Sequence, residues 1–265
     1  MSLFARCFKL GALAVAAVAI CANGAQVPQH IDVKPFQKIE NVVVPLPNEV
    51  FGALNKLGSV NWHEYVRTGK GNNFTERPRI ALLLGTVIAD GFIAVQAEDA
   101  PAVKDIGQRV QALARGIGVE RSITQHAKAI IEAADKRKWE SVRQELDRTQ
   151  SSVQQAMNEV HDEKLSQLVS LGGWLRGTEI LTAVVTKRYS HEGAELLHQP
   201  DLLAYFQTRL QAMPEFNVTI IREIHEALVQ VKPMIDVGTS RISAESVKKI
   251  NEITTRLDYG IVTRQ

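Results

Sequence analysis

Two long apolar stretches dominate the pattern of hydrophobic and polar positions along this chain. The first runs from Arg79 to Gln96 and carries one ionisable side chain, Asp90, between its ends. The second runs from Leu165 to Thr186 and carries Arg176 and Glu179, which are three residues apart and so share a helix face. A helix that is apolar on all sides is buried in a core or in a membrane, and the internal charges favour a core. We therefore predict two central core helices.

Glycines in both stretches indicate that the two helices pack closely together. A glycine inside a helix costs roughly 1 kcal/mol relative to alanine, which calls for a packing reason, and a missing side chain lets a neighbouring helix approach. The glycines concerned are Gly85, Gly91, Gly172, Gly173 and Gly177. We predict that Asp90 contacts Arg176, because burying an unpaired carboxylate costs several kcal/mol. Thr75 is the predicted cap of the first helix.

Asp90, Arg176 and Glu179 have two interpretations. In one, they form a polar site inside the bundle that takes a ligand or a proton. In the other, they are a structural ion pair that fixes the register of the two helices. Structural ion pairs also perturb pKa values without serving any chemistry, so we favour the structural interpretation.

The rest of the pattern is that of successive helices after an extended arm. No proline occurs between Pro101 and Pro200, and apolar residues recur there every three or four positions. Four prolines within residues 25–47 favour extended backbone instead. The sequence predicts an all-α fold, a helical bundle of about eight to ten helices with an extended N-terminal arm. The expected parts are a signal peptide over 1–24, the arm over 25–47 and a single all-helical domain over 48–265.

A heptad stripe runs along the predicted helix from Trp139 to Val160. Its members are Trp139, Val142, Leu146, Thr149, Val153, Ala156 and Val160. Such a stripe is one seam of an antiparallel bundle or the interface of a homodimer, and we favour the seam within one chain. The preceding helix is predicted to begin at a capping Ser122, and its His126 is expected to be a boundary residue with a satisfied hydrogen bond.

The segment between residues 59 and 74 is the most irregular internal part of the chain. Trp62, His63, Tyr65 and Arg67 gather within it. Loops on rigid scaffolds often carry binding residues, and aromatic side chains beside an arginine can form a recognition surface. The alternative, which we favour, is a single helical turn that docks its Trp62 on the core.

The strongest candidate for a metal site is the set His191, Glu195 and His198. The string HEGAE departs from the zinc-protease pattern HExxH, because Glu195 stands where the second histidine belongs. The ExxH formed by Glu195 and His198 is one half of a di-iron motif whose second half we do not find in the sequence. Residues seven apart are also about 10 Å apart along a helix, which is too far for one ion. We therefore favour an amphipathic helix that ends before Pro200.

The first 24 residues have the pattern of a secretory signal peptide. Its parts are the basic Arg6 and Lys9, the apolar run Leu10–Ile20 and the small-residue site Ala22–Gly24 before Ala25. A lipoprotein anchor at Cys21 is disfavoured because a large residue, Ile20, precedes it. We expect export, and the short apolar run and the scarcity of cysteine favour a bacterial periplasm.

Cysteine content and charge exclude several classes of function. Both cysteines, Cys7 and Cys21, fall in the predicted signal peptide. The mature chain would then have no thiol nucleophile, covalently attached haem, cysteine zinc site or iron–sulfur cluster. Removal of Arg6 and Lys9 takes the formal charge from +2 to zero, which offers no general attraction to nucleic acid or an anionic membrane. The sequence also lacks the Walker and G-x-S-x-G motifs.

These observations favour an exported, soluble helical protein that acts as a non-catalytic binding or protein-interaction module. Its partner would be an unidentified protein or small molecule, and we predict no nucleic acid, no cofactor and no stable transmembrane helix in the mature chain. The alternative is a ligand- or metal-binding bundle, with or without enzymatic activity, whose buried polar site is built on Asp90, Arg176 and Glu179.

Overall fold

Helices make up nearly all of the chain that the structure describes, which confirms the predicted all-α bundle. The computed structural model describes residues 38–39, 42–43, 47–69, 74–159, 162–214 and 218–263. The predicted signal peptide and the first part of the arm lie outside these residues. The described residues fall within one compact unit, Phe36–Gln265.

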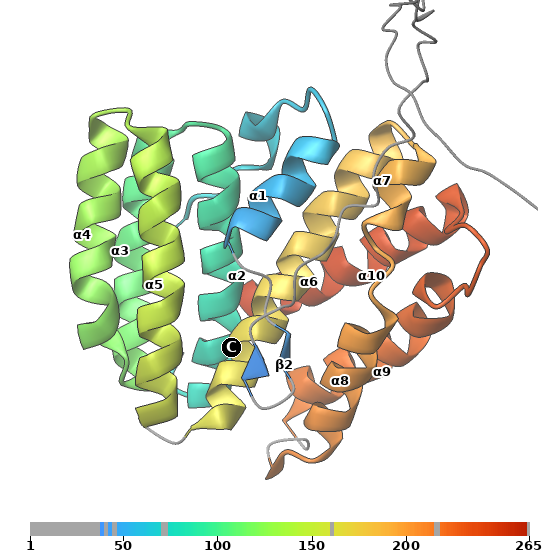
Figure 1. Cartoon of the computed structure of the whole chain (residues 1–265). Coiled ribbons are helices and arrows are strands. Elements are labelled where there is room, and N and C mark those ends of the chain that lie inside the picture. Colours follow the sequence, from blue (N-terminus) through green and yellow to red (C-terminus); the bar gives the residue numbers. More distant parts are fainter. Residues whose placement is uncertain are drawn as a thin grey trace, which may run out of the picture. The chain divides into compact units, whose positions relative to one another are not determined.

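The described part contains ten α-helices, one 3-10 turn and a short hairpin (Figure 1). The helices are α1 (Pro47–Lys56), α2 (Arg77–Gln96), α3 (Ala100–Ile117), α4 (Glu120–Asp135), α5 (Trp139–Glu159), α6 (Glu163–Lys187), α7 (His191–Glu195), α8 (Pro200–Gln211), α9 (Thr219–Ile235) and α10 (Ala244–Thr263). The 3-10 turn is η1 (Trp62–Tyr65). The hairpin pairs β1 (Lys38–Ile39) antiparallel with β2 (Val42–Val43), so part of the predicted arm is extended.

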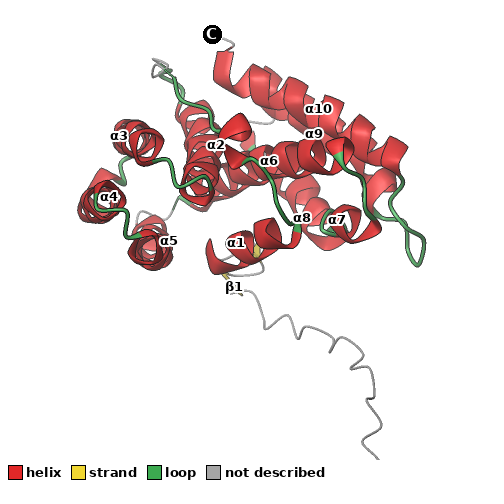
Figure 2. Cartoon of the chain, turned by 90° about the horizontal axis from the view of Figure 1, so that it is seen from above, coloured by secondary structure: helices red, strands yellow, loops and turns green. Residues whose placement is uncertain are grey.

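The two apolar stretches form α2 and α6, which lie side by side at the centre of the bundle (Figures 1 and 2). The helices α3, α4 and α5 follow on the side of α2, and α10 packs on α6 with α9 and α8 beyond it. By length and composition both central helices could cross a membrane, yet 72% and 56% of their most apolar windows are buried inside the protein. A core helix passes the same test, so the absence of a transmembrane helix stays a prediction.

Two glycines bring the backbones of α2 and α6 into contact, as predicted. A Cβ atom added at Gly85 would lie 1.8 Å from the carbonyl oxygen of Val169, and one added at Gly172 would lie 2.0 Å from the carbonyl oxygen of Leu82. No side chain fits at either position without moving the opposite helix. This contact fixes the spacing and the register of the two helices, and hence which polar side chains meet across them.

Two helices, α2 and α4, begin at other residues than the sequence predicted. α2 begins one residue later than a cap at Thr75 requires, because Glu76 is the N-cap residue and makes no side-chain capping bond. α4 begins at Glu120, so Ser122 lies inside its first turn and is not the cap. Gly118 ends α3 with a φ of +86°, and the turn after it is so tight that α4 starts two residues beyond.

The heptad stripe of α5 faces the interior of this chain. Trp139, Val142 and Ala156 are buried in the main core, and Leu146 packs against it. The side chains of Val153 and Val160 lie outside the described set. Since α5 packs along α4, the stripe serves as a seam of the bundle, and dimerisation through the Trp139–Val160 helix stays a prediction.

We predict that Gly85→Ala lowers the free energy of unfolding by at least about 3 kcal/mol, the upper end for overpacked cores, because the new methyl group overlaps a carbonyl of α6. The matched control is Gly177→Ala, where an added Cβ meets nothing within 4 Å, and it should stabilise by up to about 1 kcal/mol. Urea unfolding of both variants measures the difference. Equal effects at the two glycines would contradict the close contact.

Candidate functional site

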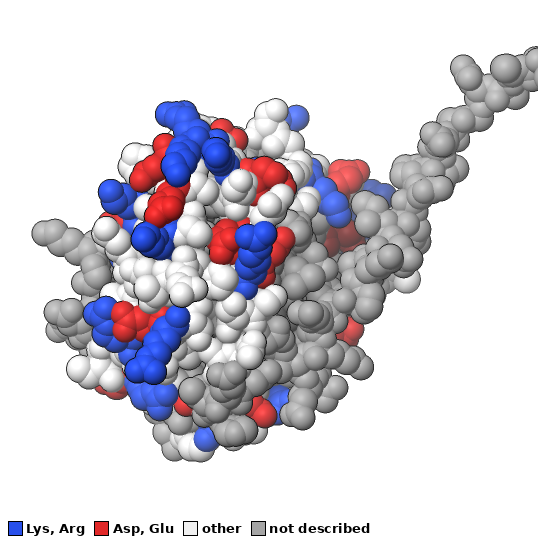
Figure 3. Space-filling model, turned by 60° about the vertical axis from the view of Figure 1, so that its left-hand side comes forward, with Lys and Arg blue, Asp and Glu red and all other residues white. Residues whose placement is uncertain are grey.

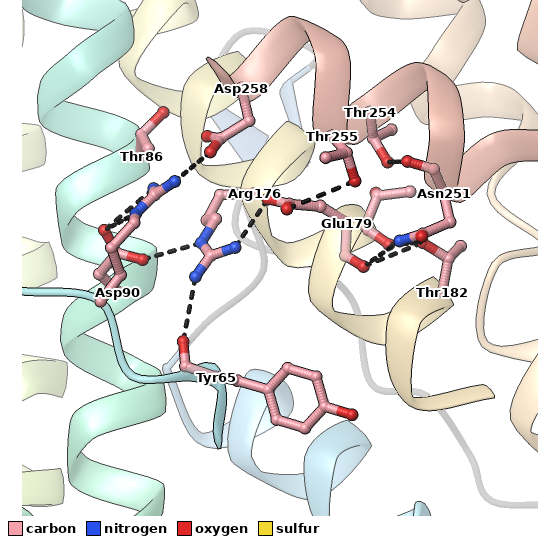
Figure 4. Close-up of polar contacts among 12 residues, drawn as sticks. Tyr65, Thr86, Asp90, Arg176, Glu179, Thr182, Asn251, Thr254, Thr255 and Asp258 are labelled. Carbon is pink, nitrogen blue, oxygen red and sulfur yellow. Dashed lines mark hydrogen bonds and ion pairs between the residues drawn. The ribbon is translucent and has the colours of Figure 1, made fainter. Parts of the chain in front are cut away.

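Five charged side chains meet where α2, α6, α10 and the segment after η1 come together. Arg67 follows η1, Asp90 lies on α2, Arg176 and Glu179 lie on α6, and Asp258 lies on α10. Figure 4 shows polar contacts of Asp90, Arg176, Glu179 and Asp258. We call these five residues the interior charged cluster. The sequence predicted three of them, and the structure adds Arg67 from the irregular segment and Asp258 from the last helix.

Asp90 is the centre of the interior charged cluster. It is fully buried, and Arg176 donates to its Oδ1 from Nε at 2.8 Å, which confirms the predicted contact. Arg67 donates to the other oxygen, Oδ2, from Nε at 3.2 Å and from Nη2 at 3.1 Å. Both carboxylate oxygens are therefore held by guanidinium groups, which is the pairing a buried carboxylate requires.

Arg176 joins three segments of the chain. Besides Asp90, it donates from Nη1 to Glu179 Oε2 at 2.7 Å and from Nη2 to the backbone carbonyl of Tyr65 at 3.1 Å. The planar guanidinium suits this role because its donors point in fixed, divergent directions. The end of η1 is thus tied to α2 and α6 through one buried side chain.

Arg67 connects α2 to α10. Its Nη1 donates to Asp258 Oδ2, while its other two contacts go to Asp90. Burial by itself would lower the pKa of Arg67, but the charges and hydrogen bonds of Asp90 and Asp258 outweigh that effect and raise the pKa above its ordinary value. Asp258 is 2% exposed, and its Oδ1 has no hydrogen-bond partner within the described part of the chain.

The interior charged cluster holds three carboxylates against two guanidinium groups, so full ionisation leaves one negative charge. Burial raises the pKa of Glu179, and the charge of Asp258 raises it further. The charge and hydrogen bond of Arg176 act in the opposite direction without cancelling the rise. Ionisation of the Glu179 carboxyl is therefore less favourable in the folded protein than in water.

Neutral polar groups of α10 hold Glu179 from the other side. Asn251 donates from Nδ2 to the carbonyl of Glu179 at 2.9 Å and to Thr182 Oγ1 at 3.0 Å. Thr255 donates to Glu179 Oε1 at 3.5 Å. These bonds fix α10 on α6 next to the charged residues.

The residues predicted as a recognition surface are docked on the bundle. Trp62 is buried with apolar residues of α1, α2 and α6, as the alternative interpretation predicts, so it presents no aromatic surface to a partner. His63 is exposed and faces Asp99 at 3.5 Å. The ring of Tyr65 lies under Lys187, with the ammonium nitrogen 4.9 Å from the ring centre.

The structure does not assemble the candidate metal site. α7 is only five residues long and ends at Glu195, so the i+7 spacing of His191 and His198 is not a helical one. His198 lies 3.2 Å from Glu195, and His191 instead faces the hydroxyl of Tyr189 at 3.1 Å. Across the described residues no group of three histidine or carboxylate side chains is arranged to hold an ion. The expected amphipathic helix up to Pro200 is likewise shorter than predicted.

A second polar cluster, which the sequence analysis missed, lies between α4 and α5. His126 contacts Glu145 Oε1 through Nδ1 at 2.6 Å and Ser152 Oγ through Nε2 at 2.8 Å. Arg148 donates to Glu145 Oε2 at 2.9 Å. The hydrogen bonding expected for His126 is confirmed, but its partners come from the next helix. The available signal was the seven-residue spacing of Glu145 and Ser152, which puts both on one face of α5.

Comparisons of the chain with protein-family models, with curated proteins and with solved structures found no match.

We predict that Glu179→Gln stabilises the protein more as the pH rises from about 4 to 8. A carboxyl whose pKa is raised on folding favours the fold while it is protonated and loses that contribution as the pH rises through its folded pKa. Glutamine does not ionise, so the melting temperature of the variant minus that of the parent should increase as the pH rises. The control is Glu252→Gln, an exposed position on α10. A gap that narrows with rising pH would refute the raised pKa.

Proposed function

We propose that this chain is an exported helical protein that works by binding a partner, and that its interior charged cluster is a structural clamp and not a reaction centre. The observation that supports the clamp is the pairing of its two central side chains. Both oxygens of Asp90 and every side-chain nitrogen of Arg176 have partners within the chain itself.

A site built for a ligand directs donors or acceptors toward the place the ligand will occupy. In the interior charged cluster the donors and acceptors of Arg67, Asp90 and Arg176 instead join η1 and the segment after it to α2, α6 and α10. Asp258 Oδ1 is the exception, since it has no partner in the described part of the chain. The clamp would hold the segment around Arg67 in place, and the residues available for a partner would then lie elsewhere on the surface. This favours the binding module over the alternative of a ligand or metal site around Asp90.

Surface charge supports a partner that is not a polyanion. On the face drawn in Figure 3, lysine and arginine lie interspersed with aspartate and glutamate. The chain from Ala25 onward has a formal charge of zero, since the first 24 residues contain two of the 31 basic residues and none of the 29 acidic ones. Mixed charge of this kind does not concentrate anionic ligands. We propose a protein or a small molecule as the partner.

We further propose export to a bacterial periplasm, on the strength of the N-terminal pattern. Expression of the full-length chain in a bacterial host should give a periplasmic protein whose intact mass is that of a chain starting at Ala25. The control replaces Leu10 and Leu13 in the apolar run by aspartate, which should leave the uncleaved chain inside the cell. Recovery of the parent chain with Met1 from the cytosol would refute export.

We predict that Asp90→Asn lowers the free energy of unfolding by roughly 3 to 5 kcal/mol, because the buried Arg176 and the partly exposed Arg67 lose their shared counter-ion. Asp135→Asn at an exposed position is the matched control and should change stability by less than about 0.5 kcal/mol. Urea unfolding gives both values. Native mass spectrometry of the same samples should give no ligand whose binding depends on Asp90: the parent chain should carry no small molecule that is missing from the Asp90→Asn variant.

The opposite pair of results supports the alternative function. A parent chain that carries a stoichiometric ligand or metal, together with an Asp90→Asn variant that loses it at unchanged stability, would make the interior charged cluster a binding site. A parent chain that is recovered in a stable complex with a second macromolecule supports the binding module.

A further inference from the structure

The cluster between α4 and α5 has the arrangement of a charge-oriented nucleophile. It is formed by His126 on α4 and by Glu145, Arg148 and Ser152 on α5, two helices that contribute nothing to the interior charged cluster. The inference drawn from it goes beyond the proposed function and does not rest on it.

The hydrogen bonds of His126 decide which of its nitrogens carries a proton. Burial by itself would raise the pKa of Glu145, but the hydrogen bonds from His126 and Arg148 and the charge of Arg148 act against burial, and this pKa lies below its usual value. An ionised Glu145 only accepts hydrogen bonds, and it therefore takes the N–H of His126 Nδ1 at 2.6 Å. In the neutral histidine, the form that can act as a base, the lone pair of Nε2 then faces the hydroxyl of Ser152 at 2.8 Å.

We propose that Ser152 is a nucleophile, that His126 is its general base, and that the site accepts acyl groups from small carboxylic esters. The diagnostic geometry of an activated serine is a hydroxyl within hydrogen-bond reach of a base that a third group orients. Glu145 is the positioning residue here. The histidine and glutamate side chains are 20% and 14% exposed, which shields the pair from water, and Ser152 is half-buried and so reachable by a small substrate.

A donor for the developing oxyanion must come from a side chain, because Ser152 lies inside α5, where backbone N–H groups bond within the helix. Arg148 lies one turn before Ser152 and so on the same face. It donates to Glu145 from Nη1, its side chain is 68% exposed, and a guanidinium carries further donors. Arg148 is therefore the side chain that we assign as donor to the developing oxyanion.

The reaction follows from these positions. The oxygen of Ser152 forms a bond to the acyl carbon while its proton passes to Nε2 of His126. The ester bond breaks, and the alcohol leaves with that proton. Water then attacks the acyl carbon while His126 takes a proton from it. The bond from that carbon to the Ser152 oxygen breaks, His126 returns the proton to this oxygen, and the carboxylic acid is released.

A fluorophosphonate probe tests the nucleophile directly on the purified chain. Attack by Ser152 forms a bond from its oxygen to phosphorus and expels fluoride, so the intact mass rises by one adduct, and peptide mapping should place it on Ser152. Ser152→Ala should abolish the adduct. Ser151→Ala is the matched control and should keep it, because the Ser151 hydroxyl bonds to the carbonyl of Asp147 and not to His126.

The positioning role of Glu145 is tested by rate, with hydrolysis of p-nitrophenyl acetate as the readout. Glu145→Gln should slow labelling and hydrolysis by roughly 10²-fold, the lower range for general-base catalysis, and Glu145→Asp should restore part of the rate. Melting curves of all variants check that the fold is kept. No adduct on a folded parent chain, or an adduct that Ser152→Ala retains, would overturn the proposal and leave the cluster as a polar contact between two helices.

Discussion

The rest of the structure depends on the backbone contact between α2 and α6. Because Gly85 and Gly172 have no side chains, each lets a carbonyl of the opposite helix approach to a distance that no other residue allows. A contact of this kind has only one register, since a shift along either helix would bring side chains against backbone. The close packing of these helices therefore acts as a geometric constraint as well as a source of burial.

The interior charged cluster is a consequence of that register. With the glycines in contact, Asp90 on α2 lies against Arg176 on α6, and Glu179 follows Arg176 on the same helix. Arg67 and Asp258 come from segments before α2 and after α6 in the sequence. Buried charges of this kind contribute less to net stability than well-packed apolar side chains would, since desolvation offsets their attraction. Their effect is to make one arrangement of four segments far better than any other, because each wrong arrangement leaves a charge without its partner.

Most of the fold could be predicted from the sequence, and only part of the site. Apolar runs and glycines are local signals, so the two central helices, their contact and the pair of Asp90 and Arg176 were within reach. Asp258 was not, because its role depends on where the last helix packs, which periodicity does not report. Arg67 was singled out because aromatic residues lie next to it in the sequence, and its contacts with Asp90 and Asp258 were not predicted. The spacing of His191 and His198 suggested a helix face, but the helix ends between them.

The ion pair of Arg67 and Asp258 joins positions 191 residues apart in sequence. Loops of that length close late, because the contacts that reward closure form only after most of the chain is available. The last helix must therefore be present before Arg67 gains its second carboxylate partner, Asp258. For a chain that crosses a membrane unfolded, N-terminus first, completion of the core would wait for the final residues to emerge, so the order of folding would be set by the order of translocation.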